Sequence, residues 1–354
     1  MRAQLEAFFN RFWYNPKSGI VSYLLLVCLL PLSWIFILLS VIRRALYHYQ
    51  FLKSHKLPAF VVVVGNLNVG GTGKTPFVIW LALQLKMAGY YPGIISRGFG
   101  GKMQGEVLIN SQALLLGDEP VLIKQRTQCP VFVGQNRVLA GLSLLEAYPQ
   151  CNIIISDDGL QHTKLQRDFE IVVVDSQRQF GNHHCLPAGP LREPIKRLMS
   201  VDVAVVNGAH QPLHASLQGA FVMNFEMQLL VNLVDHQTVL SASALMKVAQ
   251  ENHQIICAIA GIGNPQRFFN ALTALGLIFE SQVFADHYQY QAHDLSVLAK
   301  NIIVMTEKDA VKCQQFATPN IWYLPITANL LDGTTLVARI GKQIQGEESS
   351  VEST

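Results

Sequence analysis

The chain has 354 residues, half of them hydrophobic, and a formal net charge of +3. This length suggests about two domains, with enough apolar residues to build large cores. The small charge, without a Lys/Arg-rich run carrying interleaved aromatic residues, argues against a nucleic-acid-binding protein. Six cysteines are scattered without a Cys-x-x-Cys pair, which is typical of reduced core cysteines in a cytosolic domain.

An uncharged apolar stretch, Ile20–Ile42, has Lys17 before it and two arginines directly after it. Its length predicts a helix that crosses a membrane. It is too long, and lacks the small-residue cleavage site, for a cleaved signal peptide. Pro31 near its middle predicts a kink, so a re-entrant segment is one alternative and a buried helix of a soluble protein is another. The flanking positive charges are nearly balanced and leave the orientation open.

The residues ahead of this stretch place aromatic and basic side chains near one helical face. They are the apolar Leu5, Phe8, Phe9, Phe12 and Trp13, with Arg2 and Arg11 among them. The pattern favours a helix lying at the lipid headgroups, and a plain extension of the membrane helix is the alternative. Residues 1–44 are therefore expected to form a membrane-associated N-terminal region.

A strand, a glycine-rich loop and a helix follow. The apolar run Phe60–Val64 predicts a buried strand, and Pro76–Lys86 predicts a helix. The loop between them is typical of a P-loop, in which backbone N–H groups and the helix dipole hold phosphates. Lys74 would neutralise the β/γ oxygens, and the Thr75 hydroxyl would bind Mg²⁺. The expected nucleotide-binding residues are Asn68, Val69, Gly70, Gly71, Thr72, Gly73, Lys74 and Thr75.

One position departs from the usual P-loop pattern, because Asn68 stands where the first glycine is expected. The alternative interpretation is a glycine-rich turn followed by a chance Lys-Thr. The flanking strand and helix favour the phosphate site, so we expect the chain to bind a nucleoside triphosphate.

A second strand, residues 152–155, leads into Asp157 and Asp158. An apolar strand that ends in aspartate can hold Mg²⁺ through a carboxylate, as a P-loop enzyme requires. Asp-Gly alone is ordinary turn chemistry, so the motif gains its weight from the P-loop. Which of the two aspartates ligates the metal is left open.

Apolar runs define the expected architecture. Three more predict strands of a doubly wound parallel sheet, at residues 131–133, 171–174 and 203–206. Around residues 221–237 the pattern changes to short polar-broken strands, interpreted as a linker. A second βα unit follows, and its Gly-Ile-Gly lacks the third glycine of a dinucleotide fingerprint, so NAD is not expected. We predict an α/β protein with a P-loop domain over residues 45–225 and a smaller α/β domain over residues 226–354.

Several loops carry charged residues. Arg97 follows a short strand, where it could meet phosphate or cap a turn. Asp118 precedes a proline-led helix start, whose ordinary role is an N-cap. Arg137 opens another helix. A proline-rich loop presents Arg192 and Glu193; its adjacent His-His-Cys cannot supply a tetrahedral zinc site without distant partners.

The second half of the chain carries two further polar groups. Asp286 and His287 stand at the end of an expected strand over residues 283–288. Thr-Glu-Lys-Asp follows another strand at residues 306–309, in an order that does not match the guanine-reading motif of GTPases.

Seven motifs occur in order along the chain. They are Gly-Asn-Leu-Asn-Val-Gly-Gly-Thr-Gly-Lys-Thr-Pro, Ser-Arg-Gly-Phe-Gly, Gly-Asp-Glu-Pro, Asp-Asp-Gly-Leu-Gln-His, Leu-Pro-Ala-Gly-Pro-Leu-Arg-Glu-Pro, Phe-x-Asp-His-Tyr and Thr-Glu-Lys-Asp-Ala-Val-Lys. Together they resemble the tetraacyldisaccharide 4′-kinase (lipid A 4′-kinase) family over nearly the whole chain, including the N-terminal membrane helix. The P-loop of that family is similarly variant at the position of Asn68.

The resemblance implies transfer of the ATP γ-phosphate to the 4′-hydroxyl of a tetraacylated glucosamine disaccharide 1-phosphate, which gives lipid IVA in lipid A biosynthesis. It implies ATP and Mg²⁺ as cofactors and a lipid disaccharide as substrate, at the cytoplasmic face of a bacterial inner membrane. Neither nucleic acid nor an obligate protein partner is implied. It also implies that a β-ribbon linker joins the two domains, with the active site in the cleft between them.

The resemblance also assigns roles to residues. Asp118 would be the base, oriented by His287 from the second domain, with Asp286 beside it. The chemistry of phosphoryl transfer itself, independently of the resemblance, assigns neutralisation of phosphate charge to Mg²⁺ together with Lys74, Thr75, Asp157 and Asp158. Contacts with substrate or phosphate are expected from Arg97, Arg137, Arg192 and Glu193.

The alternative function is a membrane-tethered P-loop switch or assembly ATPase that phosphorylates no acceptor. Formation of ADP that depends on an added lipid disaccharide would separate the two.

Overall fold

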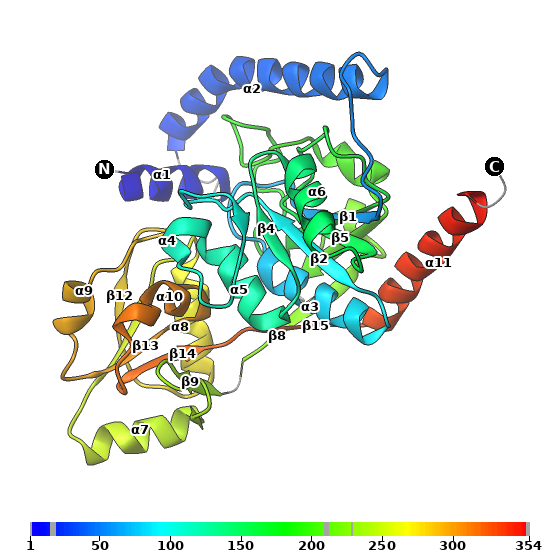
Figure 1. Ribbon diagram of the computed structural model, residues 1–354. Coiled ribbons are helices and arrows are strands. Elements are labelled where there is room, and N and C mark those ends of the chain that lie inside the picture. Colours follow the sequence, from blue (N-terminus) through cyan, green and yellow to red (C-terminus); the bar gives the residue numbers. More distant parts are fainter. Residues whose placement is uncertain (1, 15–18, 209–211, 228, 352–354) are drawn as a thin grey trace. The chain divides into compact units, whose positions relative to one another are not determined.

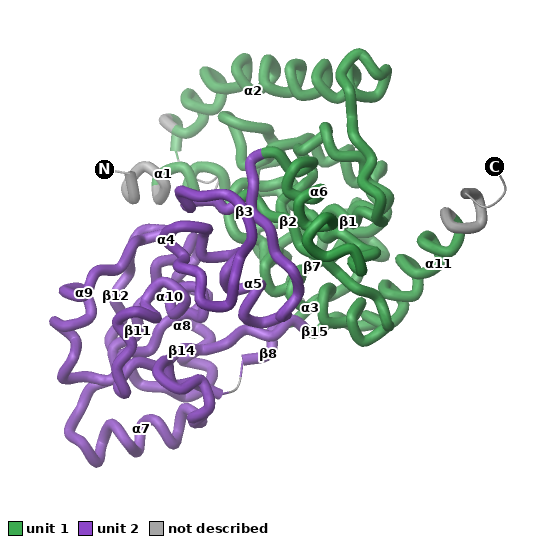
Figure 2. The backbone as a smooth tube through the Cα atoms, viewed as in Figure 1, with its two compact units in different colours: residues 1–97, 136–224, 329–354 green, residues 98–135, 225–328 purple. Residues whose placement is uncertain are grey.

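The computed structural model describes residues 2–14, 19–208, 212–227 and 229–351. Its backbone separates into two compact units (Figure 2). Unit 1 comprises residues 1–97, 136–224 and 329–354, and unit 2 comprises residues 98–135 and 225–328. The sequence suggested two contiguous domains, whereas residues 98–135 group with unit 2 and the C-terminal residues with unit 1.

A mostly parallel sheet forms the centre of unit 1. Its strands run in the order β15-β8-β7-β6-β1-β5-β2, and neighbours from β8 to β2 are parallel. The central strands are nearly continuous apolar runs, as is typical of parallel strands covered on both faces. The bounds are β1 (Phe60–Gly65), β2 (Pro92–Ser96), β5 (Ile153–Asp157), β6 (Phe169–Asp175), β7 (Val203–Asn207), β8 (Phe221–Glu226) and β15 (Thr327–Leu330).

Three helices pack on this sheet or on one another: α3 (Lys74–Met87), α6 (Arg137–Ala147) and α11 (Gly333–Val351). The predicted helix start at Arg137 is confirmed, because the Asn136 side chain caps it by accepting the N–H groups of Val138 and Leu139. Close packing of α11 on α3 requires Gly333, where a Cβ atom would lie 2.5 Å from Trp80. Two short 3₁₀ helices complete unit 1, η1 (Ile195–Ser200) and η2 (Ala215–Leu217).

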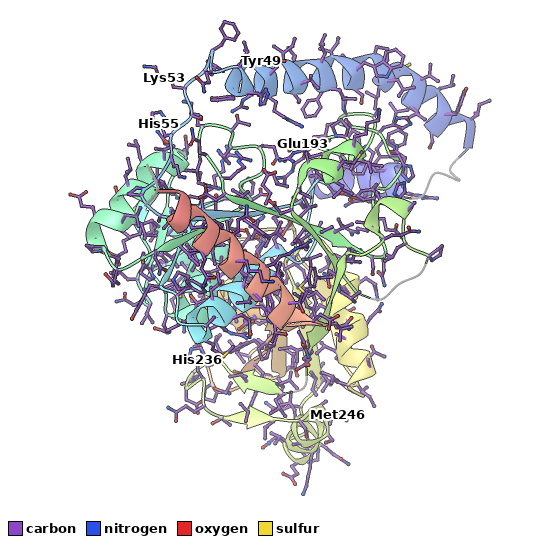
Figure 3. All side chains as sticks on the ribbon, turned by 90° about the vertical axis from the view of Figure 1, so that its right-hand side faces the viewer. Tyr49, Lys53, His55, Glu193, His236 and Met246 are labelled. Carbon is purple, nitrogen blue, oxygen red and sulfur yellow. The ribbon has the colours of Figure 1, made fainter. Side chains whose placement is uncertain are left out.

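Two N-terminal helices, α1 (Arg2–Tyr14) and α2 (Gly19–His48), belong to unit 1. Figure 1 shows α2 as a long helix along the outside of this unit, bent in its N-terminal part, and the view in Figure 3 agrees. Pro31 inside the helix gives a reason for the bend. Its segment Ser22–His48 contains an 18-residue window with a mean hydropathy of 2.8, and it is the one helix among the described residues long and apolar enough to cross a membrane.

The apolar residues predicted on one face of α1 differ in exposure. Phe12 is buried against the protein, whereas Phe8, one turn earlier on the same face, is half exposed. Contact of this face with lipid headgroups stays a prediction. The side chains of Arg2 and Leu5, and the whole of Lys17, lie outside the described residues.

A six-stranded sheet forms the centre of unit 2, in the order β10-β9-β14-β13-β11-β12. The pairs β11–β12, β11–β13 and β13–β14 are parallel, and β9 pairs antiparallel with β10 and β14. Its strands are β9 (Leu230–Asn232), β10 (Val239–Leu240), β11 (Ile256–Ala260), β12 (Glu280–Val283), β13 (Ile302–Thr306) and β14 (Ile321–Leu324). The helices α7 (Ala242–Glu251), α8 (Pro265–Ala274), α9 (Ala292–Ser296), α10 (Glu307–Cys313) and η3 (Gln314–Phe316) join them.

Side chains alternate between two cores along β13. Ile302 and Val304 join a cluster with the α8 phenylalanines, while Ile303 and Met305 join a cluster with Tyr290. This period of two places one core on each face of the sheet. One expected strand is wrong: β12 ends at Val283, so residues 284–288 do not extend it. His287 has a φ of 57°, which extended backbone does not allow.

Residues 98–135 add two short strands and two helices to unit 2: β3 (Gly105–Glu106), α4 (Ala113–Leu116), α5 (Asp118–Thr127) and β4 (Val131–Val133). The helix α5 packs against α10. The ion pair between Arg126 and the buried Glu307, 2.6 Å long, joins the two helices. This ion pair joins the last turn of α5 to the first turn of α10. Lys308, in the same turn of α10, reaches Glu119 in the first turn of α5 at 3.0 Å.

Candidate active site

The glycine-rich loop lies between the central strand β1 and the start of α3. Gly70 and Gly73 have φ of 102° and 95°, a conformation that favours glycine. Gly73 caps α3 without a side-chain hydrogen bond, so the first N–H groups of the helix have no capping side chain. Backbone N–H groups and the helix dipole at such a terminus suit an anion.

Asn68 explains why the first P-loop glycine is dispensable here. Its backbone does not adopt a positive φ, so glycine is not required at this position. Its buried side-chain amide donates hydrogen bonds to the carbonyl of Gln179, at 2.7 Å, and to the hydroxyl of Tyr14, at 3.3 Å. The amide therefore ties the loop to neighbouring segments.

Lys74, Asp158 and Arg192 meet beside the loop. Lys74 Nζ lies 3.5 Å from Asp158 Oδ1, and Arg192 donates to both Asp158 oxygens at 3.1 and 2.9 Å. Burial alone would raise the pKa of Asp158, but the two cations outweigh it and lower the pKa to about 2. The structure thus brings together the lysine, one of the two aspartates and the loop arginine that the sequence singled out.

Asp157 ends β5 in the register position beside Val64 of β1, at the edge of the sheet where the glycine-rich loop begins. It is buried, and its carboxylate accepts a hydrogen bond from Ser96 at 3.1 Å. The Arg137 guanidinium donates to its main-chain carbonyl at 3.0 Å. Burial lowers the pKa of Arg137 to about 10, although Asp157 and Asp158 oppose this shift, so Arg137 remains a cation.

The residues beside the loop suit the metal ion that a P-loop implies. All the ligand atoms offered by Thr75, Asp157 and Asp158 are oxygens, and Mg²⁺ prefers oxygen ligands. Asp157 adjoins the start of the loop by its register with β1, and Asp158 reaches Lys74 in the first turn of α3. The donor chemistry and this common position fit a magnesium ion.

Arg97 directly follows β2, and its side chain is exposed. Among the described residues, it forms no ion pair or hydrogen bond with the other site residues predicted from the sequence. Its charge acts on His162: burial, together with the positive charges of Arg137 and Arg97, lowers the pKa of His162 to about 4. His162 is therefore neutral at physiological pH. It belongs to the Asp-Asp-Gly-Leu-Gln-His motif, which the sequence analysis quoted without giving the histidine a role.

Glu193 is held by groups of its own chain. Its buried carboxylate accepts hydrogen bonds from Gln161, at 2.8 Å, and from Arg44 of α2, and it lies 3.4 Å from Arg197. Figure 3 shows Glu193 beneath α2, facing that helix. These contacts make Glu193 a link between α2 and the loop that carries Arg192.

A second polar cluster lies in unit 2. His287 Nδ1 is 3.0 Å from Asp118 Oδ2, and Lys308 Nζ is 3.8 Å from the same oxygen and 3.0 Å from Glu119. Asp118 is almost fully buried, whereas the His287 side chain is 23% exposed. Asp286 accepts the main-chain N–H of His287 at 3.0 Å, and its carboxylate lies 4.0 Å from His287 Nε2.

The neighbouring charges in this cluster shift the pKa values of Asp118, His287 and Lys308. Burial alone would raise the pKa of Asp118, but Lys308 and then His287 lower it to about 2, so the carboxylate is ionised. The hydrogen bond with Asp118 raises the pKa of His287. Burial would lower the pKa of Lys308, but the nearby carboxylates, Glu119 foremost, outweigh it and raise the pKa above its ordinary value.

Two expectations about Asp118 need revision. It does not cap α5 as an N-cap residue; Gly117 holds that position, and Asp118 Oδ1 accepts only the N–H of Glu119. Its partner His287 was expected from another domain, but both residues lie in unit 2, so their hydrogen bond needs no movement between domains. Sequence analysis assigned Lys308 no role, although it lies in the Thr-Glu-Lys-Asp motif, because nothing in that motif shows that the lysine contacts Asp118 and Glu119.

The comparisons with known proteins agree on one family. A family model described as LpxK, tetraacyldisaccharide-1-P 4′-kinase, matches residues 25–345. The chain is similar to the tetraacyldisaccharide 4′-kinase of Methylobacillus flagellatus, with 47% identity covering 93% of this chain and 94% of that protein. It is also similar to the enzyme of that name from Nitrosococcus oceani, with 46% identity covering 90% of each.

A solved structure has the same fold. A crystal structure of LpxK from Aquifex aeolicus in complex with ATP is similar with a TM-score of 0.72 and 30% identity, covering 90% of this chain and 99% of that one. The α/β fold class predicted from the sequence is thereby confirmed.

Proposed function

Because the chain belongs to the tetraacyldisaccharide-1-phosphate 4′-kinase family, a family of kinases that act on a hydroxyl, we propose how its residues carry out the transfer. The γ-phosphate of ATP passes to the 4′-hydroxyl of a tetraacylated glucosamine disaccharide 1-phosphate, and the product is lipid IVA of lipid A biosynthesis. The observation that carries this proposal is the group of Lys74, Asp158 and Arg192 at the N-terminus of α3, beside a loop shaped by two left-handed glycines.

The phosphate end of the site binds and neutralises charge. Residues 68–75 supply N–H groups to the phosphates, and Lys74 neutralises the oxygens of the phosphate that leaves ATP. Lys74 lies near Asp158, which holds its ammonium group at the start of α3. Arg192 and Arg137 add positive charge to the same edge of the sheet.

Thr75, Asp157 and Asp158 would hold magnesium, which neutralises phosphate charge when it is bound. Asp157 is pre-oriented by Ser96, since the serine hydroxyl donates to one of its carboxylate oxygens. The ionised state of Asp158 keeps that carboxylate ready as an acceptor across the physiological pH range.

The polar cluster of unit 2 removes a proton in the proposed reaction. Asp118 is buried and a weak base, and it holds the imidazole of His287 by accepting a hydrogen bond from Nδ1–H. His287 Nε2 then receives the proton of the 4′-hydroxyl as that oxygen bonds to phosphorus, and Asp118 stabilises the imidazolium. This assignment exchanges the roles expected from the resemblance, because the more exposed group with the higher pKa is the histidine. Asp286, 4.0 Å from Nε2, also favours the charged imidazole.

In this proposal the enzyme is held at the bacterial inner membrane by its N-terminal helices, and the catalytic units lie on the cytoplasmic side, where ATP is available. The length and exposed apolar surface of α2 support this placement. The acyl chains of the substrate remain in the lipid layer while its sugar hydroxyl meets the protein.

The test is acceptor-dependent formation of ADP. The full-length protein in detergent micelles is given Mg²⁺ and ATP, with and without the tetraacylated disaccharide 1-phosphate. The proposed function predicts ADP formation that rises with the acceptor and saturates. The same ADP rate in both samples would support a switch ATPase instead.

A further inference from the structure

We propose that Tyr14, at the C-terminal end of α1, is a positioning residue for the phosphate loop. The inference rests on the proposed ATP site and adds to it a part of the chain that sequence analysis assigned to the membrane alone. It starts from Asn68, the loop residue that departs from the usual P-loop pattern.

The first half of the phosphate loop is held by a second segment of unit 1. Leu67 accepts the N–H of Arg192 at 2.6 Å, and Val69 donates to the carbonyl of Pro190 at 2.8 Å. Asn68, between them, forms a bridge with Leu191. Residues 67–69 therefore run beside residues 190–192, and the position of one segment fixes that of the other.

The end of α1 bonds to residue 68 of the phosphate loop and to residue 187, which precedes the segment 190–192. The Tyr14 hydroxyl accepts a hydrogen bond from the Asn68 amide at 3.3 Å, and the Trp13 indole donates to the carbonyl of Pro187 at 3.2 Å. The backbone of Trp13 can lie this close to Gly181 only because glycine has no side chain. A Cβ atom at that position would lie 2.9 Å from the Trp13 carbonyl oxygen. Burial raises the pKa of Tyr14, so its hydroxyl stays neutral.

A second link reaches the loop through Arg178. Its guanidinium lies over the Tyr14 ring, 5.2 Å from the ring centroid. The same guanidinium lies close to the loop, since a Cβ atom on Gly70 would be 3.8 Å from it. Tyr14 is thus linked to both ends of the Asn68–Gly70 turn. It bonds to the Asn68 amide directly and contacts Arg178, which lies beside Gly70.

These contacts have a defined consequence for binding. A loop already ordered in the free protein loses less conformational freedom when phosphate binds, so it binds more tightly. Removal of the Tyr14 hydroxyl takes away one of the two acceptors of the Asn68 amide group, while the hydrogen bond to Gln179 remains. The expected effect is weaker ATP binding, by about fivefold, as for the loss of one hydrogen bond. Turnover at saturating ATP should hardly change, because Tyr14 does not act on the reacting atoms.

The experiment measures the Kd of a non-hydrolysable ATP analogue with Mg²⁺ by calorimetry on the full-length chain. Tyr14→Phe removes the hydroxyl and keeps the ring. Tyr23→Phe is the matched control, because it makes the same change on an exposed tyrosine of α2. Asn68→Ala, with and without Tyr14→Phe, tests whether the hydroxyl acts through the amide.

The proposal predicts a Kd raised about fivefold in Tyr14→Phe and unchanged in Tyr23→Phe. In the Asn68→Ala background, Tyr14→Phe should cause no further loss of affinity for the ATP analogue. An unchanged Kd in Tyr14→Phe, with or without a lower melting temperature, would overturn the inference and leave the ATP site intact. The inference would also be overturned if Tyr14→Phe raised the Kd as much in the Asn68→Ala background as it does in the unaltered chain. If the unaltered chain failed to bind the analogue, the proposed function itself would fall.

Discussion

The imidazole of His287 and the carboxylate of Asp118 are hydrogen-bonded at 3.0 Å, although 169 residues separate them in the chain. Two packing features bring them together. The insertion of residues 98–135 into unit 2 places α5 against α10, and the left-handed turn at His287 directs its side chain back toward the start of α5. The ring also lies beside Phe99, with 4.9 Å between centroids. The pair is therefore formed by elements of unit 2 alone.

Asp118→Ala and His287→Ala should each lower kcat by about 10²-fold or more, because each removes one half of a proton-accepting unit. The double variant should be little slower than either single variant, since the halves do not act independently. Affinity for ATP should stay the same, which calorimetry would check alongside steady-state rates. Rate losses that multiply in the double variant would show that the residues act separately.

Lys74→Ala should lower the rate of transfer by at least about 10²-fold, because it removes the cation that the phosphate loop places on the transferred group. Lys86→Ala is the matched control, since Lys86 lies in the last turn of the same helix. Rates at saturating acceptor would be compared with melting temperatures. Near-normal turnover in Lys74→Ala would contradict the phosphate-site assignment.

Lys308→Met should move the acid limb of the kcat profile to higher pH. Lys308 lowers the pKa of both Asp118 and His287. Without it the pKa of His287 rises, so the neutral imidazole that can accept a proton appears only at higher pH. Lys308→Arg should restore the profile, and Lys300→Met, at an exposed position, should leave it unchanged. A lower melting temperature with an unmoved limb would mean that Lys308 only joins α5 to α10.

Deletion of residues 1–44 should release the protein from membranes into the supernatant after centrifugation, because it removes the one long apolar helix among the described residues. It should also weaken ATP binding, since it removes Tyr14, and loosen the Arg192 loop, since it removes Arg44 from Glu193. Persistence in the membrane pellet would reveal another membrane-binding surface.

The parts of this site that the sequence could reveal are those made by neighbours in the chain. The strand, the loop and Lys74 form a local pattern, and Asp157 follows its own strand, so both were predictable. The Asp118–His287 pair came only from resemblance, since no spacing relates two residues that meet through helix packing. Lys308 and Tyr14 were missed for the same reason. Each lies in a segment whose pattern suggested another role, and its partner lies far away in the chain.

The central claim is that the chain phosphorylates the 4′-hydroxyl, and the position of the transferred phosphate tests it most directly. The full-length protein is incubated with γ-labelled ATP, Mg²⁺ and either the tetraacylated disaccharide 1-phosphate or its 4′-deoxy analogue, and the products are located by mass spectrometry. The account predicts one added phosphate at the 4′ position of the first acceptor, none on the second, and strong loss of the product in His287→Ala. Labelled phosphate on the 4′-deoxy acceptor, or at another hydroxyl of the first, would contradict it.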